Sequence, residues 1–272
     1  MKQSRLALIL VAALALTTGP LLNLHTTTAR ADSASMLDTI RKNGVIRIGV
    51  AADPPYTLQD KSGHWYSFVP SIDMMLAKAL GVKAQFVPTT WTVIVAGLQA
   101  NKYDIIGTSI YDTPEREKAI AFSVPYSYGG TSYVGLKETM RRFKSVKDLN
   151  NPKVTIALIT GTAEDQVTRR LFPKAQIKAF PNTTTAFLVQ EVESKHEPVF
   201  ATSSFVLFSL HKQYPNLGFL PDDDKGIDPK GICIGLPKGD PVFKAYLDGF
   251  IGALWQTGTI KRLQDQWLAN AK

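Results

Sequence analysis

The chain has 272 residues, of which 31 are Lys or Arg, 23 are Asp or Glu, and 44% are hydrophobic. This length can bury a core without disulfide or metal support, and the ordinary charge and apolar content exclude a disordered tail, a collagen-like fibre and a coiled coil. The single cysteine, Cys233, excludes an intramolecular disulfide and any cysteine-rich metal site.

Residues 1–31 are predicted to be a cleaved signal peptide. Two basic residues precede the apolar run 6–16, and the small residues of Ala29-Arg30-Ala31 form a signal-peptidase site. A retained membrane anchor is the alternative, which the interruption at Gly19-Pro20 disfavours. No later apolar run approaches the roughly 20 residues of a membrane-spanning helix. We therefore expect an exported, periplasmic protein, for which scattered basic residues make nucleic acid a poor partner.

The first half of the mature chain alternates strands with helices. Apolar and β-branched runs predict strands at Val45–Val50, Lys83–Val87 and Tyr103–Gly107. Between them, helices are predicted from Pro70 to Leu80 and from a cap at Thr90, with Ile94 and Leu98 facing inward. This repetition predicts an α/β fold with a mostly parallel sheet.

A second series of the same kind begins at Val154. Its predicted strands are Val154–Ile159, Gln176–Phe180, Val199–Ala201, Leu217–Leu220 and Gly231–Leu236. Its predicted helices are Glu164–Leu171, Thr183–Val192, Ser204–Gln213, Pro241–Trp255 and Thr259–Leu268. Two such series indicate two lobes with a cleft between them, and ligands of open α/β sheets bind beside the carboxyl ends of the strands.

Residues 108–116 follow the strand Tyr103–Gly107 and are the first candidate for this position. Thr113 is a good N-cap and Pro114 suits the first helical position, which places Arg116 in the first turn. A guanidinium there can bind a carboxylate through two parallel hydrogen bonds. The alternative is a solvated Arg116 paired with Glu115 or Asp112.

Residues 160–164 follow the strand Val154–Ile159 and are the second candidate. Gly161 lets the backbone approach a ligand closely, and the Thr162 hydroxyl can cap the next helix or donate to the ligand. The alternative is a simple connection between strand and helix. One loop comes from each series, so the two loops facing each other would hold one carboxylate from both sides.

A succession of short motifs resembles the polar-amino-acid class (family 3) of periplasmic solute-binding proteins of ABC importers. The motifs are Gly49-Val50, Pro54-Pro55-Tyr56, Leu80-Gly81-Val82, Thr89-Thr90-Trp91, Tyr103-Asp104-Ile105-Ile106-Gly107, Thr113-Pro114-Glu115-Arg116, Phe122-Ser123-Val124-Pro125-Tyr126, Gly161-Thr162, Gly235-Leu236-Pro237-Lys238-Gly239-Asp240-Pro241 and Gly258-Thr259-Ile260 with Trp267. Each fragment is weak alone. Their common order makes the resemblance strong, and it covers nearly all of the mature chain.

The resemblance implies a two-lobed periplasmic-binding-protein fold of type II, each lobe a mostly parallel sheet flanked by helices. Lobe 1 would comprise residues 32–133 and 235–272, and lobe 2 residues 134–234. Two hinge strands would join the lobes near Thr131–Leu136 and Gly231–Leu236. The resemblance also implies ABC permease subunits as partners. No metal-ligand cluster appears in the sequence, so we expect no cofactor and no metal, and we expect a monomer.

The resemblance also implies the ligand-binding residues. The Arg of the family's TPER-like motif clamps the ligand carboxylate, and this role falls to Arg116. Residues just before it assist, and a glycine–threonine loop supplies helix N-terminal donors. An aromatic side chain stacks on the ligand, with Tyr56 a weaker candidate for the wall. The assisting residues would be Ser109 and Tyr111. The glycine–threonine loop would contribute Thr162 and Ala163, and the stacking aromatic would be Trp91.

The sequence departs from the family where the ligand's ammonium group is concerned. The family's lobe-2 Asp, which pairs with the α-ammonium, is expected within residues 199–204, where this chain offers only hydroxyls such as Thr202 and Ser203. A desolvated ammonium requires a charged partner. Either Asp53 or Asp112 supplies the charge from lobe 1, or the ligand is a carboxylic acid without an ammonium. Both options remain open.

The function that follows is capture of an amino acid or related small carboxylate for an ABC importer, without catalysis. The alternative is a periplasmic cyclohexadienyl (prephenate/arogenate) dehydratase, an enzyme of the same fold. Dehydration requires a general acid, and the candidate acids near the cleft are Asp53, Asp112 and Glu164. An exported sensory or partner-docking module is a third option. The absence of a clear catalytic set favours binding.

Overall fold

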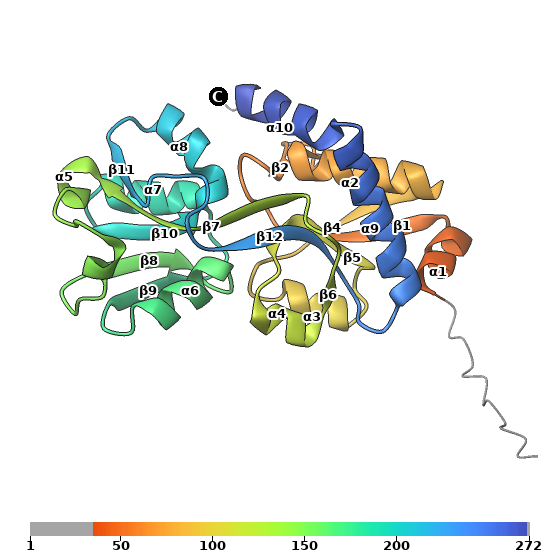
Figure 1. Ribbon diagram of the computed structural model, residues 1–272, viewed down its shortest axis with the longest axis horizontal. Coiled ribbons are helices and arrows are strands. Elements are labelled where there is room, and N and C mark those ends of the chain that lie inside the picture. Colours follow the sequence, from red (N-terminus) through yellow and green to blue (C-terminus); the bar gives the residue numbers. More distant parts are fainter. Residues whose placement is uncertain (1–34, 271–272) are drawn as a thin grey trace, which may run out of the picture. The chain divides into compact units, whose positions relative to one another are not determined.

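Two groups of parallel strands, each flanked by helices, form the framework of the protein (Figure 1). The computed structural model describes residues 35–270, which lie within one compact unit. The first group has the strand order β4-β1-β5 and the second the order β10-β8-β9. Antiparallel strands β12 and β7 lie between the groups and join them into one continuous sheet. The predicted α/β class is confirmed.

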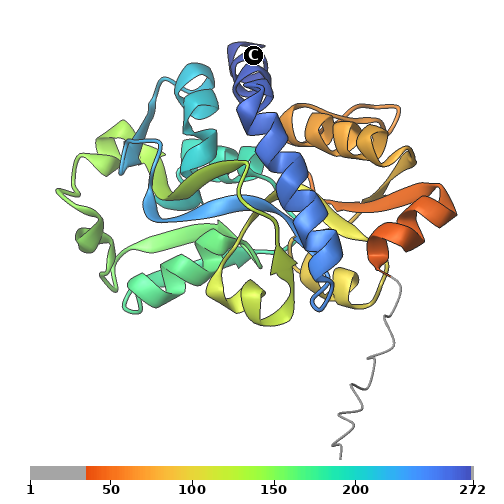
Figure 2. The same cartoon turned by 45° about the vertical axis from the view of Figure 1, so that its right-hand side comes forward.

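The first group contains both early and late segments of the chain. Its elements are α1 (Met36–Asn43), β1 (Val45–Val50), β2 (Leu58–Gln59), β3 (Trp65–Tyr66), α2 (Phe68–Leu80), β4 (Lys83–Pro88), α3 (Ile94–Gln99), β5 (Ile105–Tyr111), α4 (Pro114–Ala119), β6 (Ala121–Phe122), α9 (Pro241–Gln256) and α10 (Thr259–Asn270). Helix α9 contacts α1, and α10 contacts α2, so the C-terminal helices return to this group (Figure 2).

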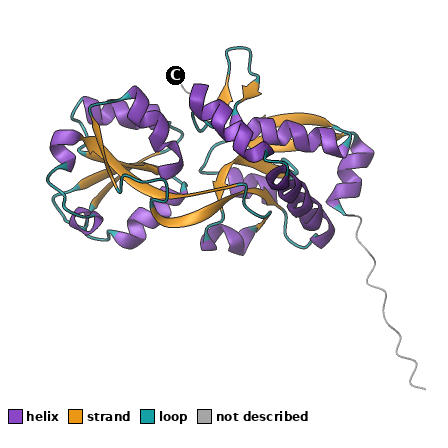
Figure 3. Ribbon diagram, turned by 45° about the horizontal axis from the view of Figure 1, so that its top comes forward, coloured by secondary structure: helices purple, strands orange, loops and turns teal. Residues whose placement is uncertain are grey.

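The second group is formed by the middle of the chain. Its elements are α5 (Lys137–Met140), η1 (Val146–Leu149), β8 (Thr155–Ile159), α6 (Ala163–Leu171), β9 (Gln176–Phe180), α7 (Thr185–Glu193), β10 (Val199–Ser203), η2 (Ser204–Val206), α8 (Leu207–Gln213) and β11 (Leu217–Leu220). Helices lie on both faces of its strands (Figure 3). The central strands β8 and β10 are buried because both of their faces are covered.

Strands β7 (Ser127–Leu136) and β12 (Ile227–Leu236) connect the two groups. Strand β12 pairs with β5 and β6 of the first group, whereas β7 pairs with β10 and β11 of the second. The two strands also pair with each other, with Ile227 opposite Thr131 and Ile232 opposite Ser127. Both strands begin earlier than the predicted hinge strands, because residues 127–130 of β7 and 227–230 of β12 extend the pairing between the two strands.

Strand β5 differs most from its prediction, since it continues to Tyr111 and was expected to end at Gly107. All seven of its residues are buried. Gly107 is required within the strand because a Cβ there would lie 2.5 Å from an Asp73 carboxylate oxygen and from Ile48. Gly107 was expected to end the strand, but it lies within the strand where neighbouring side chains pack too closely for a Cβ. Ser109 and Tyr111 therefore belong to the strand rather than to a loop.

Three further points differ from the sequence prediction or lie outside the described residues. Helix α3 begins at Ile94 with Val93 as its cap, not at a cap on Thr90, and α2 begins at Phe68, two residues before Pro70. The expected signal peptide, residues 1–31, lies outside the described residues. Within residues 35–270, no helix has the length and apolar content needed to cross a membrane.

Asp73 on α2 is fully buried, and its carboxylate oxygens have no hydrogen-bond partner among the described residues. Burial raises the pKa of Asp73 well above its ordinary value. The folded protein therefore binds one more proton than the unfolded chain above pH ~4, the ordinary carboxyl pKa, and stability falls as pH rises through that window. The slope for one such group is about 1.4 kcal/mol per pH unit.

We expect Asp73→Asn to remove this part of the pH dependence. The free energy of unfolding, measured by urea denaturation from pH 4 upward, should fall less steeply with pH in the variant than in the wild type. The difference between the two proteins isolates Asp73 from the other acids. Parallel curves would contradict a protonated Asp73.

Candidate functional site

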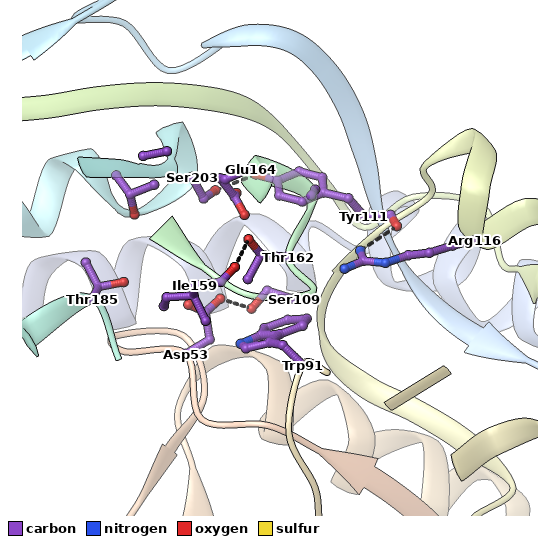
Figure 4. A pocket seen from close by; sticks show the side chains of 13 residues that line it. Asp53, Trp91, Ser109, Tyr111, Arg116, Ile159, Thr162, Glu164, Thr185 and Ser203 are labelled. Carbon is purple, nitrogen blue, oxygen red and sulfur yellow. Dashed lines mark hydrogen bonds between the residues drawn. The ribbon is translucent and has the colours of Figure 1, made fainter. Parts of the chain in front are cut away.

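A cavity lined by residues of both strand groups lies between them (Figure 4). Its walls come from the carboxyl ends of β1, β4, β5, β8, β9 and β10 or from the residues that follow them, which is where open α/β sheets bind ligands. The lining residues are Asp53, Trp91, Ser109, Tyr111, Arg116, Ile159, Thr162, Ala163, Glu164, Thr185, Ala201, Thr202 and Ser203.

Arg116 provides the positive charge of this cavity. Thr113 caps α4 and accepts a hydrogen bond from the Arg116 backbone N–H, which places Arg116 in the first turn as predicted. The guanidinium is buried and donates to the Tyr111 carbonyl at 3.0 Å and to the Gly161 carbonyl at 3.1 Å. These bonds use two of its five N–H groups. Burial lowers the pKa of Arg116 to about 10, so the side chain stays charged at neutral pH.

The turn between β8 and α6 forms the neighbouring wall from the second strand group, and its Gly161 carbonyl accepts from Arg116. The Thr162 hydroxyl caps α6 by accepting from the Asp165 backbone N–H at 3.3 Å, and it donates to the Ile159 carbonyl at 2.9 Å. Gly161 has φ +84°, a conformation that favours glycine. The N-terminus of α6, with Thr162 and Ala163, therefore faces the same cavity as the guanidinium.

Asp53 lies at the base of the cavity in the segment after β1. Its carboxylate accepts a hydrogen bond from the Ser109 hydroxyl on β5 (Figure 4). Burial raises the pKa of Asp53 to about 7; the bond from Ser109 lowers it, and the nearby Glu164 raises it. With this pKa, the Asp53 carboxyl group is partly protonated near neutral pH.

Glu164, the second residue of α6, is the other acid of the cavity and is buried. Burial raises the pKa of Glu164, while its own backbone N–H, the Thr162 hydroxyl and the charge of Arg116 act in the opposite direction. Figure 4 shows Glu164 above and Asp53 below the space between them, with Arg116 to one side. The cavity therefore holds two acids and one cation.

Two further contacts join the strand groups beside the cavity. The Tyr111 hydroxyl and the Ser203 hydroxyl share a hydrogen bond. Tyr56 donates to the Phe205 carbonyl and stacks on the Phe205 ring with 3.7 Å between centroids. Trp91 lies beside the guanidinium, with 5.9 Å from the Arg116 Cζ to the ring centroid, a distance at which cation–π attraction operates.

All but one of the ligand-binding residues inferred from the sequence line this cavity. The exception is Tyr56, which packs between Phe68 and Phe205 and is buried in the core. Asp112, considered as a partner for an ammonium, also lies elsewhere: its carboxylate accepts from the Gly231 backbone N–H at 2.8 Å, and its other oxygen lies 3.9 Å from the Cys233 sulfur.

The sequence inference did not include four lining residues: Ile159, Glu164, Thr185 and Ala201. Glu164 was considered only as a general acid of the alternative function. Thr185 begins α7 after β9, so the rule that ligands bind at strand carboxyl ends could have identified it. Within residues 35–270, no cluster of three His, Cys, Asp or Glu side chains is arranged to hold a metal ion.

Comparison with known proteins gives consistent matches over most of the chain. The family model of bacterial extracellular solute-binding proteins, family 3, matches residues 46–270. Cyclohexadienyl dehydratase from Pseudomonas aeruginosa is 26% identical over 236 residues, which cover 86% of each chain. A probable amino-acid ABC transporter-binding protein from Haemophilus influenzae is 25% identical over 236 residues, covering 86% of this chain and 89% of its own.

The solved structures include a similar protein of reconstructed sequence. The ancestral amino acid-binding protein AncCDT-1, described as a precursor of cyclohexadienyl dehydratase, has a TM-score of 0.78 and 34% sequence identity. The match covers 86% of this chain and 100% of the ancestral chain. The likeness therefore concerns the whole fold and not one motif.

Proposed function

Because the chain belongs to the bacterial extracellular solute-binding proteins, family 3, we propose that it captures an amino acid or related small carboxylate for an ABC importer. The observation that carries this proposal is the buried Arg116 guanidinium, which bonds to the Gly161 carbonyl and lines the same cavity at the strand carboxyl ends as the N-terminus of α6. A ligand carboxylate there would receive two parallel hydrogen bonds from the fork of Arg116.

The fold is the two-lobed periplasmic-binding-protein fold of type II. In our proposal lobe 1 comprises residues 32–133 and 235–272, lobe 2 comprises residues 134–234, and β7 and β12 act as the hinge. A ligand that contacts both walls stabilises the closed form in proportion to its extra contacts there. Permease subunits would recognise that form. We also propose that residues 1–31 direct export of the protein and that the mature protein is a monomer.

A thermal-shift screen tests the proposed capture. The purified mature protein is mixed with each standard L-amino acid, with cystine, and with the matching carboxylic acids that lack the amino group. At least one of these compounds should raise the melting temperature, because a ligand that binds only the folded state stabilises it. If none does, and calorimetry also detects no binding, the proposed function is wrong.

A second candidate is the cyclohexadienyl dehydratase activity, favoured by a specific observation. Burial raises the pKa of both Asp53 and Glu164 in the cavity, that of Asp53 to about 7, so Asp53 can hold a proton for a leaving hydroxyl near neutral pH. A relative at 26% identity also carries that name. Binding remains the first proposal, because Arg116 and the N-terminus of α6 can hold a carboxylate without any reacting group.

Incubation with prephenate and with arogenate separates the two candidates. We expect no aromatic product above the uncatalysed rate, measured by absorbance and chromatography. Turnover at an enzyme-like rate, abolished by Glu164→Gln or Asp53→Asn, would replace the capture function by the dehydratase.

A further inference from the structure

A second cavity adjoins the one that contains Arg116, and it is much the larger of the two. Its volume is about 330 Å³, whereas the volume of the cavity around Arg116 is about 40 Å³. A cavity of roughly 10–15 Å³ holds one water molecule, so the smaller cavity has room for about three. While the cleft has this shape, a carboxylate and few further atoms fit beside Arg116, and the rest of a ligand has to lie elsewhere.

Residues of both strand groups line the second cavity. The first group contributes β2, β3, α10 and the segment after β1, and the second group contributes α7, η2 and α8. Helices α8 and α10 lie along the same edge of the molecule (Figure 1). The residues that line the second cavity are Pro54, Pro55, Leu58, Tyr66, Thr185, Ala186, Val206, Ser209, Leu210, Gln213, Tyr214 and Trp267.

The two cavities are neighbours, because Thr185, the first residue of α7, lines both. Asp53 lines the smaller cavity, and the next residue of the chain, Pro54, lines the larger one. Figure 4 shows Arg116 at one end of the labelled side chains and Thr185 at the other, with Ser109 between them. A ligand that starts at the guanidinium and continues past Thr185 therefore reaches the second cavity.

The walls of the second cavity are largely apolar and aromatic. Among the described residues that line it, none is charged. Pro54 and Pro55 have no backbone N–H, so the chain presents no donor there that a ligand would leave unpaired. The rings of Tyr66 and Trp267 lie 6.1 Å apart at an angle of 51°. A charged group would lose its hydration in this cavity without gaining an ionic partner, whereas an apolar or aromatic group gains from leaving water.

We propose that the second cavity binds the distal end of the captured molecule, and that this molecule is an elongated carboxylate with an uncharged, apolar or aromatic tail. The inference rests on the proposed function and deepens it, since it requires the carboxylate to be bound by Arg116. It defines the class of tail, and it holds for ligands with or without an amino group beside the carboxylate. Small carboxylates and carboxylates with a charged tail are the disfavoured classes.

Two homologous series measure the contribution of the tail. Calorimetry gives the dissociation constants of 2-aminobutanoate, 2-aminohexanoate and 2-aminooctanoate, and of the three matching acids without the amino group. In the series that binds, each methylene that enters the second cavity should strengthen binding about fourfold, because burying it contributes about 0.8 kcal/mol and 1.4 kcal/mol is a factor of ten.

The outcomes of this measurement separate the inference from the proposed function. Equal affinities along the series, or no binding of any member while another carboxylate of the screen binds, would overturn the inference and leave the capture function standing. Failure of every compound of the screen and of both series to bind would instead refute the proposed function itself. These measurements use the wild-type protein, so they do not depend on whether a variant folds.

Two compounds of equal length test the charge of the tail. Lysine and 2-aminoheptanoate have chains of the same length, but only lysine ends in an ammonium group. The matching pair without the α-amino group is 6-aminohexanoate and heptanoate. In the pair that binds, the compound with the uncharged end should bind about tenfold more tightly or better, because an ammonium group in the second cavity has no acid to pair with. Equal or tighter binding of the cationic compound would overturn the inference.

Variants locate the tail within the protein. Ala186 is an exposed residue of α7 that lines the second cavity, so Ala186→Phe fills part of this space from the surface. The ratio between the affinities of the longest and the shortest binding member should fall about tenfold, since roughly two methylenes lose their place. Ala253→Phe is the matched control, because Ala253 is an exposed alanine of α9 outside both cavities, and its ratio should equal that of the wild type. An unchanged ratio in Ala186→Phe would contradict the inference.

Discussion

Arg116→Ala is expected to weaken binding of the captured carboxylate by about 30-fold to several thousand-fold. Removing one member of a buried, hydrogen-bonded charge pair costs about 2–5 kcal/mol, and 1.4 kcal/mol corresponds to a factor of ten. The guanidinium is buried and already held by the Tyr111 and Gly161 carbonyls, so little of its conformational freedom remains to be lost on binding. Calorimetry with the best ligand of the screen measures the effect.

Arg116→Lys is the informative comparison for this variant. Lysine keeps the charge but lacks the planar fork that matches a carboxylate, so its affinity should lie between those of the wild type and the alanine variant. Full affinity in Arg116→Ala, with the fold intact by circular dichroism, would place the carboxylate elsewhere.

Gly161→Ala is expected to weaken binding by about tenfold or more, through closure of the cleft. A Cβ at Gly161 would lie 2.9 Å from the Trp91 carbonyl oxygen and 3.0 Å from the Thr92 Cα, both backbone atoms of the opposite strand group. Neither atom can move as a flexible side chain would. The left-handed φ of +84° adds about 1–2 kcal/mol of strain, which lowers stability whether or not the cleft is closed.

Gly239→Ala separates these two effects. Gly239 has φ +90°, and a Cβ there would meet no heavy atom within 4 Å. Both variants should therefore melt at a lower temperature, but only Gly161→Ala should lose affinity. Equal affinities in the two variants would show that the Gly161 turn does not approach the opposite wall when ligand binds.

Much of the fold follows from local sequence signals. The strands Val45–Val50, Gln176–Phe180 and Leu217–Leu220 have the bounds that their apolar and β-branched runs predict. Thr113 and Thr162 cap the helices that were expected after them, because a hydroxyl before a helix accepts from an orphan backbone N–H. These short-range effects are fully encoded in the local sequence.

The grouping of the site residues also follows from a general rule. Strand carboxyl ends meet at one edge of a parallel sheet, so residues from distant segments, such as Trp91, Arg116 and Thr162, reach one cavity. Tyr56 breaks the pattern because it stacks on Phe205 from the other strand group. A contact between residues 149 positions apart leaves no local signal in the sequence.

The charges of the site required the three-dimensional structure. Asp53 and Asp112 were equivalent candidates from the sequence, and only the fold shows that Asp53 bonds to Ser109 inside the cavity while Asp112 bonds to the β12 backbone. Glu164 looked like an ordinary acid of a first helical turn, which the helix dipole favours. Its burial in the same cavity as Asp53 depends on how the two strand groups approach each other.

A crystal structure of the protein with the tightest-binding compound of the screen would locate the ligand carboxylate. We predict that the ligand's carboxylate lies within hydrogen-bonding distance of the Arg116 guanidinium. A ligand bound outside this cavity, or bound within it with its carboxylate turned away from Arg116, would show that Arg116 does not clamp the carboxylate.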